Sequence, residues 1–169
     1  EMPDVALRAV EEGGPLQIEA VRTAQRELEQ GIREIRELVR GFQPPLLESN
    51  GLRAAIEDLV RRTSIPVELD VLCSARLPAM VERTLFFFVS EALANANKHS
   101  RASRIGVRIR QEGPLVRAEV ADDGIGGLES TRGGGISGLQ ERLGAAGGTL
   151  EFESRAGEGT TLRAAVPLD

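Results

Sequence analysis

The sequence predicts an α+β domain, a two-layer α/β sandwich in which helices cover a mixed, mostly antiparallel sheet, with a further helix at the N-terminus. Five segments alternate apolar and polar residues, as half-buried strands do. Four of these segments form two pairs joined by short turns that contain glycine, which is how antiparallel neighbours are connected. Longer segments in which apolar residues recur at helical spacing separate the first strand from the first pair and the first pair from the second. The predicted strands are 66–72, 105–109, 115–121, 149–154 and 160–166, and the predicted helices are 51–62, 81–99 and 136–146.

The segment before residue 48 predicts a helix with one apolar stripe. Its apolar residues follow the 4-3-4-3 spacing of a coiled coil: Leu28, Ile32, Ile35, Val39 and Phe42. Pro44 and Pro45 end this helix, because neither ring offers an N–H. We expect the stripe to pack against a partner helix or, as a weak homodimer, against a second copy of the chain; packing back onto its own domain is the alternative. The expected units are 1–47 and 48–169.

Composition limits the classes of function. The chain has 169 residues, a net charge of -5 and an isoelectric point near 5.1, which argues against nucleic acid as a partner because phosphate binding needs a basic face. One cysteine, Cys73, allows no internal disulfide, and one histidine, His99, argues against a His/Cys zinc site. No apolar run in the sequence reaches membrane-spanning length. We expect a cytoplasmic domain without membrane contact of its own, whose parent protein can carry an anchor elsewhere.

The predicted helix 81–99 ends with the first group of residues that suits chemistry. Glu91, Asn95 and His99 recur at every fourth position and so share one helix face, with Lys98 beside it. Carboxylate and amide oxygens are ligands for a hard cation such as magnesium, and lysine and histidine can donate to phosphate oxygens. This face favours a magnesium–phosphate complex; a solvated polar face at the end of a core helix is the alternative.

An aspartate pair follows the predicted strand 115–121. Asp122 and Asp123 enter a turn in which Gly124 and Gly126 allow the backbone to come close to a ligand. An aspartate among apolar walls can accept a hydrogen bond from an exocyclic amine such as that of adenine. An ordinary Asx turn is one alternative. A calcium loop is another, and it is disfavoured because no ladder of further acidic residues follows.

Two further segments suit an anion. Glycines 133–135 lead into the predicted helix 136–146, whose N-terminal N–H groups and dipole attract negative charge. The segment lacks the Gly-Lys-Ser/Thr of a P-loop and the parallel βαβ setting of a dinucleotide fingerprint. The last turn, 157–159, is followed by Thr160 and Thr161, whose hydroxyls can face the site. A flexible loop and a plain hairpin turn are the alternatives for these two segments.

Together the four segments resemble the N box, the two glycine boxes and the terminal Gly-Thr-Thr of the histidine-kinase ATPase family: 91–99, 122–127, 133–139 with Glu141-Arg142, and 159–161. That family shares the Bergerat ATP-binding fold with gyrase B, MutL and the heat-shock chaperone ATPases. The resemblance covers about residues 52–169. It implies a domain that binds ATP with Mg2+ and transfers the γ-phosphate to a histidine of a dimerisation domain. An anti-sigma-factor-type serine kinase and a non-catalytic ATP-sensing module of the same fold are the alternatives.

The resemblance also implies roles for single residues. By this comparison Asn95 would ligate magnesium, Lys98 and His99 would meet the phosphates, and Asp122 would read the adenine amine. Glu91 would assist phosphotransfer or hold the metal through water. The remaining nucleotide-binding positions that it implies are Gly124, Gly126, Gly135, Gly138, Leu139, Thr160 and Thr161. The glycines would shape the lid and the phosphate loop.

Residues 26–47 resemble the end of the dimerisation hairpin in kinases that pair with LuxR-type response regulators, and the short lid 128–132 also fits that subfamily. Residues 1–47 are therefore expected to be a remnant of the dimerisation and phosphotransfer region. One departure matters: 13–17 resembles the tail of the phosphoacceptor motif, but Glu12 stands where the family has histidine. We do not expect this chain to phosphorylate itself on histidine at that position.

Overall fold

The computed structural model describes residues 45–73, 76–127 and 134–169. The chain divides into two units between Gln43 and Pro44, and every described residue belongs to the second unit. The predicted N-terminal helix with its apolar stripe, and the lid 128–132, lie outside the described residues.

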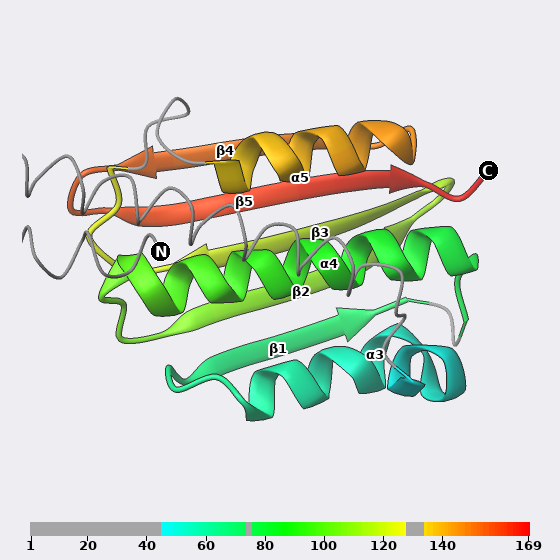
Figure 1. Ribbon diagram of the computed structural model, residues 1–169, viewed down its shortest axis with the longest axis horizontal. Coiled ribbons are helices and arrows are strands. Elements are labelled where there is room, and N and C mark those ends of the chain that lie inside the picture. Colours follow the sequence, from blue (N-terminus) through cyan, green and yellow to red (C-terminus); the bar gives the residue numbers. More distant parts are fainter. Residues whose placement is uncertain (1–44, 74–75, 128–133) are drawn as a thin grey trace, which may run out of the picture. The chain divides into compact units, whose positions relative to one another are not determined.

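Five strands form one sheet in the order β1-β2-β3-β5-β4 (Figure 1). Strands β1 and β2 are parallel, and every other neighbouring pair is antiparallel. The sheet is therefore mixed and mostly antiparallel, which confirms the predicted class, and each of the five predicted strands is present. Their bounds are β1 Val67–Leu72, β2 Ile105–Glu112, β3 Leu115–Asp122, β4 Thr149–Arg155 and β5 Gly159–Pro167.

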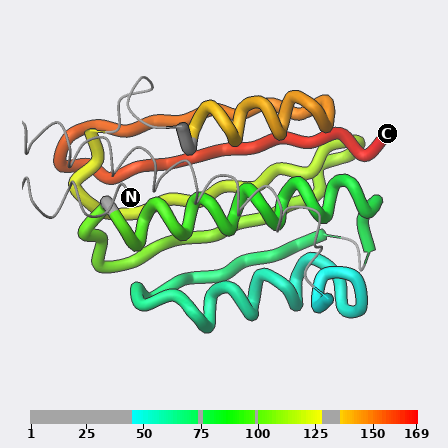
Figure 2. Tube along the Cα trace, viewed as in Figure 1, coloured from blue at the N-terminus to red at the C-terminus, as the bar shows by residue number. Residues whose placement is uncertain are grey.

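The helices α3 (Pro45–Arg61), α4 (Ala79–Asn95) and α5 (Gly134–Ala145) lie on one face of this sheet. Helix α3 contacts β1 and α4, helix α4 crosses β3 and β5, and α5 packs on β4 and β5. The trace in Figure 2 shows the tight turns that connect β2 to β3 and β4 to β5. This arrangement confirms the two-layer sandwich. No described helix has the length and apolar character needed to cross a membrane.

The core lies between the helices and the sheet because the strands alternate. In β2, Ile105, Val107 and Ile109 are buried under the helices, whereas Arg108 and Arg110 are exposed on the opposite face. Helix α4 supplies the largest apolar contribution, with its buried residues facing the sheet: Val81, Leu85, Phe86, Phe88, Val89, Ala92 and Leu93. The polar outer face of the sheet thus needs no second helical layer.

Helix α3 begins earlier than predicted. It starts at Pro45, whereas the sequence predicted a helix from Gly51. Proline is well placed in the first turn of a helix, because the N–H that it lacks would have no partner there. Gly51 has a φ of 78° and kinks the helix. The kink therefore lies at the residue where the sequence predicted the helix to begin.

The single continuous α-helix predicted for 81–99 is wrong in its last turn. After Asn95 the backbone forms a π-helix, η1 (Ala96–Ser100), which ends at Arg101 with a positive φ of 52°. A π-helix bonds each residue to the fifth one along, so its turn is wider than that of an α-helix. The fourth-position spacing of Glu91 and Asn95 on one helix face therefore does not continue regularly to position 99.

Candidate functional site

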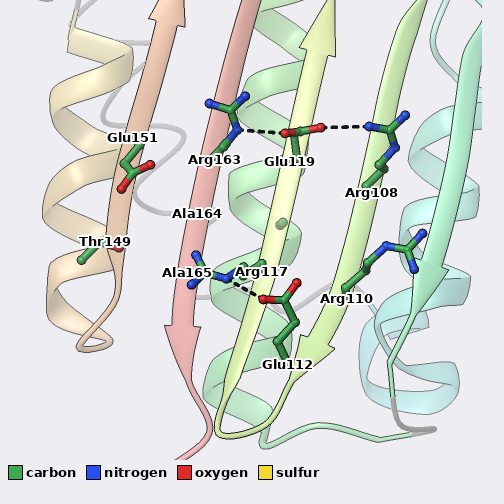
Figure 3. A pocket seen from close by; sticks show the side chains of 11 residues that line it. Arg108, Arg110, Glu112, Arg117, Glu119, Thr149, Glu151, Arg163, Ala164 and Ala165 are labelled. Carbon is green, nitrogen blue, oxygen red and sulfur yellow. Dashed lines mark hydrogen bonds and ion pairs between the residues drawn. The ribbon is translucent and has the colours of Figure 1, made fainter.

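One hollow of the domain lies on the outer face of the sheet, away from the helices (Figure 3). It has a volume of about 190 Å³ and is lined mainly by arginine and glutamate, with none of the predicted site residues. Glu119 accepts hydrogen bonds from Arg108 at 3.3 Å and from Arg163 at 2.9 Å. Arg110 pairs with Asp70, and the other arginine of the hollow, Arg117, pairs with Glu112. These arginines are already neutralised by carboxylates, so the hollow does not attract an anionic nucleotide.

A smaller cavity of about 50 Å³ lies on the helix-covered face, where α4, η1, β3, β5 and α5 meet. It brings together four of the predicted site residues, namely Asn95, Asp122, Gly126 and Thr160. The complete lining is Ala92, Asn95, Ala96, Ser100, Val120, Asp122, Gly126, Ile136, Thr160 and Leu162. The cavity therefore joins apolar walls to a few convergent polar groups, which is the usual composition of a small-molecule site.

Asp122, the last residue of β3, is held in place by backbone N–H groups. Its carboxylate accepts hydrogen bonds from the amide of Gly124 at 2.9 Å and from the amide of Thr160. Burial raises the pKa of this carboxyl above its ordinary value, against the effect of those two amides. The result is an oriented acceptor at the edge of an apolar cavity, suited to a hydrogen bond from an amine.

The adjacent Asp123 has a different, structural task. Its carboxylate accepts from the amide and the hydroxyl of Ser103, at 2.8 and 2.7 Å, and from the amide of Arg104 at 3.0 Å. The hydroxyl of Ser103 and the amide of Arg104 lower the pKa of Asp123 to about 2. Asp123 thereby fixes the loop that leads into β2 and does not line the cavity.

The two aspartates should respond to acid over different pH ranges and in different properties of the protein. Since burial raises the pKa of Asp122, we expect the affinity for ATP to fall as the pH drops toward that raised value and the acceptor loses its charge. The folded pKa of Asp123 is about 2 and its ordinary value is 3.8, so its stabilising effect is present above 3.8 and is lost as the pH falls toward 2. Acid denaturation measures the loss of stability due to Asp123, and calorimetric titration of ATP at decreasing pH measures the loss of affinity due to Asp122. The Asp123→Asn variant should lose that part of the acid dependence of stability and retain the acid dependence of ATP affinity.

Close packing requires glycine at two of the predicted positions. A Cβ atom at Gly124 would lie 2.1 Å from the carbonyl oxygen of Ser100, which already accepts from the amide of Ile125 at 2.7 Å. At Gly126, where φ is 56°, a Cβ atom would lie 1.9 Å from the carbonyl oxygen of Arg155. The turn after β3 is therefore pressed against η1 on one side and the β4–β5 turn on the other.

The glycines of the second box differ from these. Gly135 and Gly138 lie within helix α5. A Cβ atom at Gly138 would meet nothing within 4 Å. Packing of the domain itself therefore gives no reason for glycine at position 138.

The two threonines lie on opposite faces of the sheet, because successive residues of β5 alternate. Thr160 is buried on the cavity side, and its hydroxyl lies 2.9 Å from that of Ser154. Thr161 pairs across the sheet with Ala121 and Glu153 and shares the outer face with Arg163. The structure thus separates Thr161 from the cavity that Thr160 lines. The remaining predicted position on α5, Leu139, is a buried core residue and does not line the cavity.

The N-box residues lie where α4 passes into η1. Asn95 is half-buried and lines the cavity, and Glu91 lies one turn earlier on the same helix. Within the part of the chain that the structure describes, the side-chain amide of Asn95 makes no hydrogen bond. Lys98 is exposed, and His99 follows it in η1.

Sequence reasoning missed the apolar walls and Ser100. Ala92 of α4 and Ala96 at the start of η1 lie four residues apart on either side of Asn95, and their small side chains leave space beside it. Ile136 supplies a wall from the start of α5. The spacing of the two alanines was a signal in the sequence, whereas the contribution of Ile136 depends on how α5 lies against α4.

Comparison with known proteins identifies the family of this chain. Residues 80–169 match the family described as histidine kinase-, DNA gyrase B-, and HSP90-like ATPase. The chain belongs to this family.

Similar proteins include some that are named as sensor histidine kinases or as sensor-like histidine kinases. It is 30% identical to an uncharacterized sensor-like histidine kinase of Chloroflexus aurantiacus, with 80% of this chain and 26% of that protein covered. It is 28% identical to the sensor histidine kinase LiaS of Bacillus subtilis, with 99% and 48% covered. Among solved structures, the blue-light activated histidine kinase of Erythrobacter litoralis EL346 is similar at 25% identity and a TM-score of 0.58, with 70% and 41% covered. The chain thus spans between a quarter and a half of the length of these curated relatives.

Proposed function

We propose that this chain is the ATP-binding catalytic domain of a sensor histidine kinase, which binds Mg-ATP and transfers the γ-phosphate to a histidine on a dimerisation domain. The observation that carries the proposal is the convergence of Asn95, Asp122, Gly126 and Thr160 on one cavity from separate elements of the fold. Membership of the ATPase family and the names of the curated relatives support the same reaction.

At the base end of the site, Asp122 accepts a hydrogen bond from the exocyclic amine of adenine. Two backbone amides already orient its carboxylate, so little conformational freedom is lost when the base binds. Val120, Ile136 and Leu162 form apolar walls that suit the faces of an aromatic base. They also exclude water, which strengthens the hydrogen bond to the carboxylate.

At the phosphate end, Asn95 offers an amide oxygen to a magnesium ion, and Glu91 lies one helical turn away. Among the described residues no three histidine, cysteine, aspartate or glutamate side chains gather into a metal site. Asn95 with Glu91 nearby fits magnesium, because magnesium in nucleotide sites takes one or two protein ligands and completes its shell with phosphate oxygens and water. When bound, magnesium neutralises charge on the phosphoryl oxygens. Lys98 and His99 would add donors to the phosphates, and Glu91 would assist the transfer.

The Asn95→Ala variant should lose the effect of magnesium on nucleotide binding, because alanine offers no oxygen ligand. Calorimetric titration of ATP with and without magnesium measures this difference. Asn97→Ala is the matched control, because Asn97 is occupied in bonds to Ser64 and to the carbonyl of Leu93 and does not line the cavity. A magnesium effect that persists in the Asn95 variant would exclude this residue as the ligand.

Phosphotransfer is tested with labelled ATP and a separately supplied, histidine-containing dimerisation domain. We expect label on the histidine of that domain with the unaltered chain, and much less label with the Asp122→Ala variant at ATP concentrations that do not saturate it. Label on a serine of a partner protein would instead indicate an anti-sigma-type kinase.

A non-catalytic ATP-sensing module is the second candidate function. The observation that favours it is the single histidine of the sequence, His99, which lies in η1 beside the candidate site and not in a phosphoacceptor motif. ATP binding without transfer to any supplied dimerisation domain would identify this module.

We further propose that the parent kinase signals to a LuxR-type response regulator and that this domain works in the cytoplasm. The resemblance of residues 26–47 to the dimerisation hairpin of that subfamily and the short segment 128–132 between the glycine boxes support the partner. The demand for ATP supports the location. Rates of phosphotransfer from the parent kinase to LuxR-type and other regulators, measured side by side, test the choice of partner.

A further inference from the structure

Three consecutive phenylalanines of α4 have different surroundings. Phe86 and Phe88 are buried, with 7% and 0% of their surfaces exposed, whereas Phe87 is only half-buried. The guanidinium carbon of Arg142, on α5, lies 4.9 Å from the centre of the Phe87 ring. The ring of Phe86 meets Phe87 edge to face, with centroids 5.8 Å apart and planes at 73°. The core accounts for Phe86 and Phe88. Phe87 packs only partly against the core, and its stack with Arg142 gives a further reason for an aromatic residue at this position.

This stack and the cavity lie at different points along the same pair of helices. Ile136, near the start of α5, lines the cavity together with Ala92 and Asn95 of α4. Arg142, farther along α5, meets Phe87, which comes earlier in α4. Helices α4 and α5 therefore run antiparallel and in contact, as Figure 1 shows, with the cavity toward one end and the stack beyond it.

Helix α5 contacts α4 as well as the sheet. Leu139 and Leu143 are buried in the core between the helices and the sheet. Arg142 adds an attachment to α4, because its charged group lies over the face of an aromatic ring. Neither Phe87 nor Arg142 lines the cavity, so any effect on a ligand must pass through the position of α5.

We propose that Phe87 and Arg142 are positioning residues for nucleotide binding: their stack fixes α5 against α4 and so holds Ile136 as a wall of the adenine cavity. The inference rests on the proposed ATP-binding function and adds to it two residues outside the site. Loss of the stack should weaken ATP binding by about 2- to 5-fold, the range of a partly exposed cation–π contact.

A set of variants in the full chain tests the stack. Phe87→Leu keeps an apolar side chain and removes the ring, whereas Phe87→Tyr keeps an aromatic face for the guanidinium. Arg142→Met keeps an unbranched stem and removes the charge. We expect the leucine and methionine variants each to bind ATP more weakly, the tyrosine variant to bind as the unaltered chain does, and the Leu–Met double variant to lose less than the sum of the two single losses.

The outcomes separate positioning from general stability. Circular dichroism and thermal denaturation establish that each variant is folded, and calorimetry gives its ATP affinity. If Phe87→Leu misfolds, Arg142→Met carries the test, because Arg142 is only half-buried. A folded variant with a lower denaturation temperature and unchanged ATP affinity would overturn the inference, as would equal losses in the tyrosine and leucine variants. Absence of ATP binding by the unaltered chain would overturn the proposed function itself and this inference with it.

Discussion

We expect the Asp122→Ala variant to bind ATP about 10- to 150-fold more weakly than the unaltered chain, the equivalent of about 1.5–3 kcal/mol for a hydrogen bond to a charged group. The structure makes this loss specific. The carboxylate is fixed by the amides of Gly124 and Thr160 and lines the cavity, so its removal takes away the oriented acceptor and leaves the walls in place. Isothermal calorimetry measures the change in affinity directly.

Asp123→Ala is the matched control, since it removes the same chemical group one residue away. This variant should loosen the loop at Ser103 and Arg104, whose amides and hydroxyl donate to Asp123, while ATP affinity stays close to that of the unaltered chain. Hydrogen exchange of residues 101–104 would report the loosened loop. Unchanged affinity in the Asp122 variant, or equal losses in both variants, would refute the assignment of Asp122 as the adenine acceptor.

The second large effect is expected for Gly124→Ala. The added methyl group would overlap the carbonyl oxygen of Ser100, where the ideal position lies at 2.1 Å. Backbone atoms cannot move aside as the end of a flexible side chain can, so the turn must shift away from η1. We expect a loss of about 1–3 kcal/mol in the free energy of unfolding, typical of overpacking, together with weaker ATP binding because Asp122 lies on the same turn.

Gly138→Ala is the control for this change, and its expected effect on stability has the opposite sign. Open space surrounds this position in α5, so alanine should raise the free energy of unfolding by about 0.5–1 kcal/mol through its better helix propensity. Chemical denaturation of the two variants compares the effects. Equal destabilisation of both would contradict the packing described for the turn at Gly124. Weaker ATP binding by the more stable Gly138 variant would support the role in the phosphate loop that the family resemblance implies.

The strands and the order of the elements could be predicted because each depends on local pattern. The alternation in β5 also contained more information than the sequence prediction used. Leu162 and Val166 are apolar and share a face with Thr160, whereas Arg163 shares a face with Thr161. Position along the strand therefore already separated the two threonines, although both were expected to bind nucleotide.

The π-helix could not be predicted, because contacts distant in sequence favour it. The carbonyl oxygen of Ser100, at the end of η1, accepts a hydrogen bond from the amide of Ile125, and Ser100 packs against Gly124. The side-chain oxygen of Asn97 accepts a hydrogen bond from the hydroxyl of Ser64. Local spacing predicts an α-helix there, and tertiary contacts override that preference. The roles of Lys98, His99 and Gly135 in binding phosphate remain predictions from resemblance.

The place of β5 in the sheet has a consequence for the order in which the domain is made. Of the five described strands β5 is made last, yet it pairs with β3 on one side and β4 on the other. A nascent chain that has not reached Gly159 has no partner for β4 and lacks the amide of Thr160 that holds Asp122. The described sheet and the proposed adenine acceptor are therefore complete only once β5 has been made, and we expect a chain truncated before Gly159 to lose ATP binding.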